Sequence, residues 1–150
     1  MKDLRVWIFG GRDVGKTTIA MHAVAELRWM GVPTALTCGF ARLWGEGQHV
    51  VDLHVFNRDP VTLTPHAAAE MCVGNMNFLV IRPKYYWDNP PLCSVPQASF
   101  ESLRAEWMAE DELFEKTLRA GHVEYKTLPG MRASVAYVVD KIAQRVGVRK

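Results

Sequence analysis

A short glycine-rich segment near the start of the chain limits the possible folds more than any other feature. Residues 10–17 match the pattern G-x-x-x-x-G-K-[ST] at every position (GGRDVGKT). Residues 4–9 before them are mostly apolar, as in a buried strand, and residues 16–30 after them have apolar side chains at helical spacing. Gly31 and Pro33 then end the helix. The segment is therefore predicted to be a tight turn between a buried strand and the N-terminus of a helix.

Each part of this turn has a chemical role in holding phosphate groups. Glycines let the backbone adopt positive φ angles and approach a ligand, so that successive N–H groups surround an anion. The helix that begins near Lys16 points its positive end at the same place. We expect Lys16 to reach the β- and γ-phosphates of a nucleoside triphosphate and the Thr17 hydroxyl to ligate Mg²⁺. The residues predicted to contact the nucleotide are Gly10, Gly11, Arg12, Asp13, Val14, Gly15, Lys16, Thr17 and Thr18.

Behind this turn, predicted strands alternate with predicted helices. The strands cover residues 34–38, 49–56, 77–82 and 123–128. The helices cover residues 62–73, 98–120 and 131–146. Residues 41–48 are expected to form a loop or one helical turn. Such alternation predicts parallel βαβ units in a three-layer α/β fold. With 150 residues and no internal repeat, the chain is expected to form a single domain over residues 1–150.

Composition argues against several classes of partner. The formal net charge is only +2, too small a bias to indicate nucleic-acid or membrane binding by itself. No stretch approaches the roughly 20 apolar residues of a membrane span, and the charged N-terminus does not resemble a signal peptide. The three cysteines, Cys38, Cys72 and Cys93, are a poor disulfide framework because they are odd in number and widely spaced. We expect a cytoplasmic protein with reduced thiols and no membrane association.

Through its first thirty residues and the alternation that follows, the chain resembles the P-loop NTPase superfamily. The Ras-like GTPase branch fits poorly, because residues 52–55 (DLHV) lack the glycine of D-x-x-G. Residues 57–59 (NRD) are also one residue shorter than N-K-x-D. The nucleoside and nucleotide kinase group is more similar. This resemblance implies a five-stranded parallel sheet with the strand order 2-3-1-4-5, with the phosphate-binding loop (the P-loop, residues 10–17) after the first strand.

The same kinase group implies two further features near the active site. One is an Asp-Arg or Glu-Arg pair at the end of the third strand, and in this sequence Asn57 and Arg58 stand at that place. The other is a helical lid that bears arginines before the fifth strand, where Arg104 and Arg119 lie. Asn57 departs from the pattern and leaves the identity of the acid open. The compact form of the chain also resembles that of phage-encoded enzymes.

Two carboxylates are candidates for the missing acid. Asp52 would hold Mg²⁺ through water, although it and His54 alternate with apolar residues and fit an ordinary outward face of a strand equally well. Asp59 lies nearer the carboxyl end of the same strand, where ligands bind in open α/β sheets, and this favours Asp59. The predicted catalytic residues are Lys16, Asp59, Arg58 and Arg104. The predicted metal-binding residues are Thr17 and Asp52.

Two arginines and an aromatic segment are predicted to form the acceptor site. Arg42 and Arg58 follow the second and third strands, and their guanidinium groups suit an oxyanion or a phosphate. Residues 83–96 contain four prolines with Tyr85, Tyr86 and Trp87, which indicates a binding loop whose rings stack on a base. Plain packing of these rings on the sheet is an equal alternative. The acidic residues at positions 106, 110, 111, 112 and 115 predict a solvated helix face.

These features together predict an ATP-dependent phosphotransferase that uses Mg²⁺. The acceptor would be a nucleoside, a (deoxy)nucleoside monophosphate or a modified base in DNA. The short connection between residues 38 and 49 leaves little room for a monophosphate-binding insertion, which suggests an open acceptor site or one completed by a second subunit in a homodimer. That short connection and Asn57 also favour the alternative class, a nucleotide-binding switch or ATPase subunit that acts through a protein partner.

Overall fold

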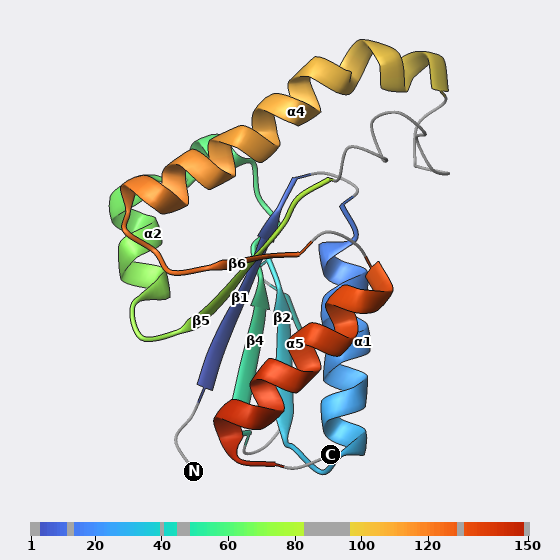
Figure 1. The fold of residues 1–150 in the computed structure, drawn as a ribbon, viewed down its shortest axis with the longest axis vertical. Coiled ribbons are helices and arrows are strands. Elements are labelled where there is room, and N and C mark those ends of the chain that lie inside the picture. The colour runs from blue at the N-terminus through green and yellow to red at the C-terminus, as the bar shows by residue number, and fades with distance from the viewer. Residues whose placement is uncertain are drawn as a thin grey trace.

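A six-stranded sheet forms the centre of the molecule (Figure 1). The computed structural model describes residues 4–11, 14–39, 41–44, 49–82, 97–128 and 131–148. Five strands run parallel: β1 (Leu4–Gly10), β2 (Thr34–Cys38), β4 (Val51–Val55), β5 (Met76–Val80) and β6 (Lys126–Leu128). The sixth, β3 (Ala41–Trp44), pairs antiparallel with β2 at the edge. The order across the sheet is β3-β2-β4-β1-β5-β6.

The prediction of a five-stranded, fully parallel sheet is wrong at one edge. Residues 41–48 were expected to be a loop or a helical turn, whereas Ala41–Trp44 forms a strand of a mixed sheet. Antiparallel neighbours need only a short turn between them, and Gly39 supplies the start of that turn with φ +62°. The order of the sheet differs from 2-3-1-4-5 by this added strand, since the parallel strands keep that sequence.

Helices cover the two faces of the sheet. Figure 1 shows α1 (Lys16–Trp29) beside α5 (Met131–Val146) on one face, and α2 (Pro65–Cys72) with α4 (Gln97–Ala120) on the other. A short 3-10 turn, η1 (Pro60–Thr62), follows β4. The long helix α4 crosses the end of the molecule where the parallel strands finish (Figure 1). The described residues therefore form the expected three-layer α/β arrangement.

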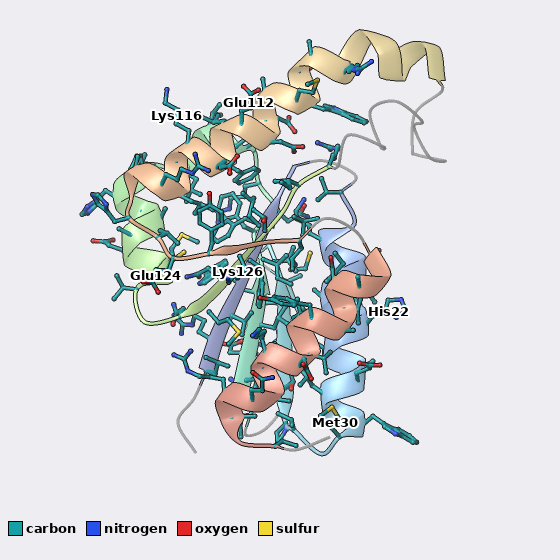
Figure 2. The ribbon with its side chains drawn as sticks, viewed as in Figure 1. His22, Met30, Glu112, Lys116, Glu124 and Lys126 are labelled. Atoms are coloured by element: carbon teal, nitrogen blue, oxygen red, sulfur yellow. The ribbon has the colours of Figure 1, made fainter. Side chains whose placement is uncertain are left out.

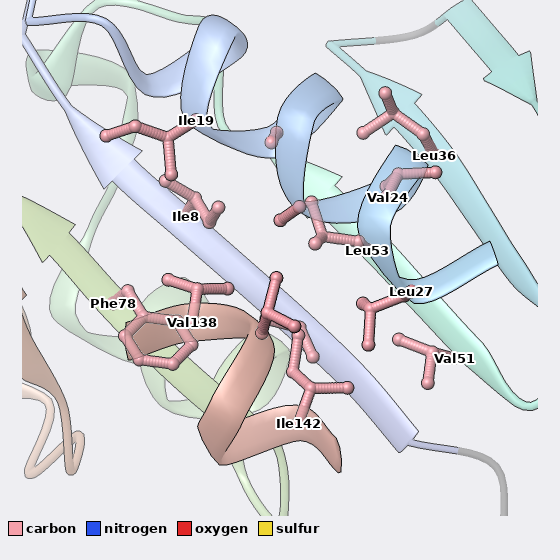
Figure 3. Packing of buried hydrophobic residues seen from close by; sticks show 14 of the residues in the cluster. Ile8, Ile19, Val24, Leu27, Leu36, Val51, Leu53, Phe78, Val138 and Ile142 are labelled. Carbon is pink, nitrogen blue, oxygen red and sulfur yellow. The ribbon is translucent and has the colours of Figure 1, made fainter. Parts of the chain in front are cut away.

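The core lies in two layers because side chains alternate across the strands. Leu4, Val6 and Ile8 of β1 face α1 and α5, in a cluster that Figure 3 shows from close by. Besides Ile8, the members labelled in Figure 3 are Ile19, Val24, Leu27, Leu36, Val51, Leu53, Phe78, Val138 and Ile142. Phe9 faces the opposite side, where it packs with Phe114 of α4. Each helical layer is thus fixed to the sheet by its own apolar cluster.

Among the described residues, no helix is both long and apolar enough to cross a membrane. Cys38 and Cys72 are free thiols, and Cys93 lies outside the described residues. Cys72 ends α2 and is buried against the Phe9 cluster. Both described cysteines therefore agree with the expected reduced state.

Cys72 is expected to be chemically inert in the folded protein. Burial raises the pKa of its thiol to about 12, so the reactive thiolate is scarce at neutral pH. A Cys72→Ser variant should leave the number of rapidly reacting thiols unchanged when the folded protein is titrated with a disulfide reagent. In urea the same variant should show one thiol fewer than the wild type. A fast-reacting thiol lost from the folded variant would contradict this expectation.

Candidate active site

The described part of the P-loop, residues 10–11 and 14–17, leads from β1 into the N-terminus of α1. Gly15 has φ +87°, in the left-handed region that glycine adopts without strain, and it caps the N-terminus of α1. Gly15 has no side chain with which to cap the helix, and the first intrahelical bond runs from Ile19 N to Gly15 O at 2.9 Å. The N–H groups in the first turn of a helix have no partners within the helix, and such an N-terminus suits an anion.

The side chains of the loop that the structure describes are arranged around this helix end. The Lys16 ammonium donates to the carbonyl of Gly11 at 3.0 Å, so the lysine folds back along the loop. The Thr17 hydroxyl lies 3.7 Å from the Cys38 thiol at the end of β2. Thr18 is exposed, and Val14 packs against the core beside α1. Arg12 and Asp13 lie outside the described residues.

The strand register brings the carboxyl ends of β1, β4 and β5 together at this loop. Gly10 at the end of β1 is level with Val80 at the end of β5. On the other side of β1, Phe56 N donates to Ile8 O at 2.9 Å as β4 finishes. The chain leaves β1 between two strands whose connections go in opposite directions, which is the place where open α/β sheets bind ligands.

Asp59 and Arg58 lie at this same edge, directly after β4. Both side chains are exposed. The Asp59 carboxylate accepts a hydrogen bond from Val61 N at 3.1 Å, and its carbonyl accepts one from the Thr62 hydroxyl at 2.7 Å. Asp59 thus caps the 3-10 turn η1. The structure gives this carboxylate a capping role at the carboxyl edge of the sheet.

Asp52 and Arg42 do not lie at the P-loop, although both were predicted to serve the site. Asp52 is level with Arg5 in β1. Arg5 is five residues before Gly10, so Asp52 lies about 16 Å from the level of Gly10 along the strand direction. Its carboxylate lies 3.5 Å from the Arg42 guanidinium and 3.0 Å from His54 Nε2. The structure therefore pairs the two predicted residues with each other, in a polar cluster on the face of the sheet, and brings neither to Thr17.

An ion pair that sequence reasoning missed lies directly beside the P-loop. Arg82 follows β5, its side chain is 1% exposed, and its Nη1 donates to Asp111 Oδ1 of α4 at 2.8 Å. The backbone N–H of Arg82 donates to the other oxygen of Asp111 at 3.4 Å. The guanidinium also lies over the ring of Trp107, with its Cζ 5.1 Å from the centroid. Arg82 is thus held by α4 through charge, hydrogen bonds and stacking.

The acidic run on α4 is therefore not a uniformly solvated face. Glu112 is exposed and points away from the sheet together with Lys116 (Figure 2). Glu110 is buried and Asp111 half-buried. A Cβ added at Gly11 would lie 2.9 Å from Asp111 Oδ1 and 3.3 Å from Glu110 Oε2. The prediction of a solvated face is wrong for Glu110 and Asp111, because they lie beside the apolar residues through which α4 packs on the sheet.

Arg104 shares a helix face with the residues that touch the loop. It is half-buried and stands seven residues before Asp111, about 10 Å along the axis of α4 on the same side. The aromatic residues Tyr85, Tyr86 and Trp87 lie outside the described residues.

Asp111 gives the fold a specific pH dependence. Burial raises the pKa of its carboxyl above the ordinary 3.8 and outweighs the opposing attraction of Arg82. At pH values between the pKa of Asp111 in the unfolded chain and its higher pKa in the folded chain, the folded chain holds a proton that the unfolded chain has released. The free energy of unfolding therefore falls as the pH rises through this window. An Asp111→Asn variant should lack that part of the slope. Urea unfolding of both proteins from about pH 4 to 7 measures it, and parallel profiles would contradict it.

The donor set of the site fits a nucleotide with a weakly held metal. Among the described residues, no group of three or more His, Cys, Asp or Glu side chains is arranged to hold an ion. Mg²⁺ in phosphoryl-transfer sites keeps most of its waters and takes its remaining ligands from one or two side chains and the phosphates. The Thr17 hydroxyl at the N-terminus of α1 suits that mode of binding, and the Lys16 ammonium suits the phosphates.

Comparison with known proteins defines the fold. No protein-family model matches the sequence, and no curated protein matches it. The structure is similar to that of shikimate kinase from Acinetobacter baumannii in complex with shikimate, with 16% sequence identity and a TM-score of 0.52 over 96% of this chain and 93% of that chain. Shikimate kinase from Aquifex aeolicus is also similar, at 14% identity and a TM-score of 0.48 over 96% of each chain. The chain thus has a mostly parallel α/β fold similar to that of the A. baumannii shikimate kinase.

Proposed function

We propose that this protein is an ATP-dependent phosphotransferase that acts on a hydroxylated or phosphorylated acceptor. The observation that carries the proposal is the P-loop itself, with Gly15 in the left-handed region as the N-cap of α1, and with Lys16 folded along the loop. The P-loop kinase fold agrees with this function. Nucleotide binding at residues 10–18 is the part of the proposal on which all the rest depends.

The residues around the loop would divide the work of phosphoryl transfer between them. Lys16 and the N–H groups of α1 would bind and orient the donor phosphates, while Arg58 and Arg104 would neutralise charge that develops on the transferred group. Mg²⁺ held by Thr17 would supply further charge neutralisation of the phosphates. Asp59, at the acceptor side of the sheet, would accept the proton of the attacking hydroxyl. Catalysis would consist of positioning and electrostatics.

The acceptor we propose is a nucleoside, a (deoxy)nucleoside monophosphate or a modified base in DNA. The β2–β3 hairpin occupies the connection where a monophosphate-binding insertion would stand. A site without that insertion is open to a large acceptor or to a second subunit. Shikimate, the ligand in the similar A. baumannii enzyme, is a further hydroxylated acceptor worth testing.

A transfer assay tests the proposal. The protein would be incubated with Mg²⁺ and ATP labelled in the γ-phosphate, together with nucleosides, monophosphates, hydroxymethylated DNA or shikimate. We expect labelled acceptor with one class only, and no label with a Lys16→Ala control. Hydrolysis of ATP without transfer to any acceptor would contradict the kinase proposal and leave nucleotide binding intact.

A second candidate function is a nucleotide-dependent switch or ATPase subunit. The observation that favours it is the direct approach of α4 to the P-loop at Gly11, through Asp111 and Glu110. A long helix that touches the loop is suited to transmit nucleotide occupancy to a partner. Asn57 in place of an acid also favours this class. Slow hydrolysis in the same assay, accelerated by a binding partner, would support it.

A further inference from the structure

Gly11 is the point where the P-loop contacts helix α4. An added Cβ there would lie 2.9 Å from Asp111 Oδ1 and 3.2 Å from Arg82 Nη1, closer than side chains normally approach. The carbonyl of the same residue accepts the hydrogen bond from the Lys16 ammonium. Gly11 therefore lies against the ion pair of Arg82 and Asp111 at its Cα, and its carbonyl oxygen holds the Lys16 ammonium.

The ion pair at this contact has little freedom to move. Asp111 receives hydrogen bonds from both the side chain and the backbone of Arg82. Arg82 Nη1 also lies 3.4 Å from the Trp107 carbonyl, and Trp107 itself is 2% exposed. A guanidinium fixed in this way cannot move to a substrate without breaking its contacts with α4. Arg82 is a rigid support for the loop rather than a mobile arginine.

We propose that Arg82 and Asp111 are positioning residues for nucleotide binding. Their ion pair holds Gly11, and through its carbonyl the Lys16 ammonium, in the arrangement that receives the triphosphate. This inference rests on the proposed binding of ATP at the P-loop. It also agrees with a glycine at position 11, since an added side chain would have to displace the ends of the Asp111 and Arg82 side chains.

Charge balance supports the pairing of these two residues. A carboxylate alone this close to the loop would repel the phosphates of a bound nucleotide. Arg82 compensates the charge of Asp111 inside the protein, so this pair by itself adds no net charge beside the loop, where Glu110 also lies. Loss of Arg82 alone would expose the site to that carboxylate, whereas loss of both residues removes only the support.

Positioning and stability can be separated because a buried ion pair is often replaceable by apolar residues of similar volume without loss of stability. The test is the double variant Arg82→Met/Asp111→Leu, with ATP binding measured by titration calorimetry and folding by thermal denaturation. We expect a Tm close to that of the wild type and at least tenfold weaker ATP binding. The control is Lys116→Met/Glu112→Leu, which removes two exposed opposite charges from the outer face of α4 (Figure 2) and should leave ATP binding unchanged.

A second variant covers the case in which the double variant does not fold. Asp111→Asn keeps the shape of the side chain and an acceptor oxygen for Arg82, and the loss of the ion pair should weaken ATP binding at least threefold. Because this change also removes a negative charge that would repel the phosphates, weaker binding can come only from lost positioning. ATP affinity within twofold of the wild type, in whichever variant folds, would overturn the positioning role. A wild-type protein that does not bind ATP at all would instead overturn the proposed function, and this inference with it.

Discussion

Replacement of Lys16 by alanine is expected to weaken ATP binding about ten- to hundredfold, with little change in folding. The ammonium lies at the start of α1 and is already directed along the loop by its bond to Gly11 O. A hydrogen bond to a charged group contributes about 1.5–3 kcal/mol, and each 1.4 kcal/mol is about a tenfold change in affinity. Titration calorimetry with ATP and Mg²⁺ measures the effect.

The control for this experiment is Lys116→Ala. Lys116 is exposed on the outer face of α4, so the variant removes the same charge from a place that the loop does not touch (Figure 2). Its ATP affinity should equal that of the wild type. Equal affinity in the Lys16→Ala variant as well would show that the P-loop does not bind nucleotide through this lysine, and the proposed function would then lose its basis.

Replacement of Phe114 by alanine is expected to lower the free energy of unfolding by about 3–5 kcal/mol. Phe114 is 0% exposed and lies edge-on to Phe56, with ring centroids 5.9 Å apart. Its ring also lies 6.4 Å from Phe9 of β1. These contacts fix α4 to the sheet, so the variant should lose stability through a cavity in the second core layer. Urea unfolding of the wild type and the variant measures the difference.

Met108→Ala is the matched comparison for Phe114, because it shortens an apolar side chain of α4 that is 38% exposed. We expect this variant to stay within about 0.5 kcal/mol of the wild type. If Phe114→Ala cost no more than that, α4 would not be held to the sheet by this face. The contact of Asp111 with the P-loop would then lack its structural support.

Local features were predictable from the sequence because neighbouring residues create them. The turn around Gly15, the helix that starts at Lys16 and the strand before Gly10 are contiguous in the chain, and the structure has all three. The cap at Asp59 is local in the same way. The edge strand β3 was not predictable, because residues 41–44 become a strand only by pairing with β2. Propensity alone did not favour a strand there.

Which residues lie beside the P-loop could not be predicted, because spacing along the sequence does not give distances between strands and helices. The alternation around Asp52 indicated its face of the sheet, but only the register with Arg5 shows how far it lies from Gly10. Arg82 and Asp111 are 29 residues apart and meet because α4 packs across the strand ends. From the sequence pattern alone, Arg82 is predicted to end a strand and Asp111 to lie on a solvated helix face.

The sequence by itself determined that this chain has a P-loop between a strand and a helix, because that pattern is a property of adjacent residues. The tertiary structure alone decided which acids stand beside the loop. In the structure Asp52 lies away from the P-loop and pairs with Arg42, whereas Asp111 lies beside Gly11. The physical reason is that apolar packing of α4 on the sheet orients the whole helix, so its polar residues take positions that their own sequence does not specify.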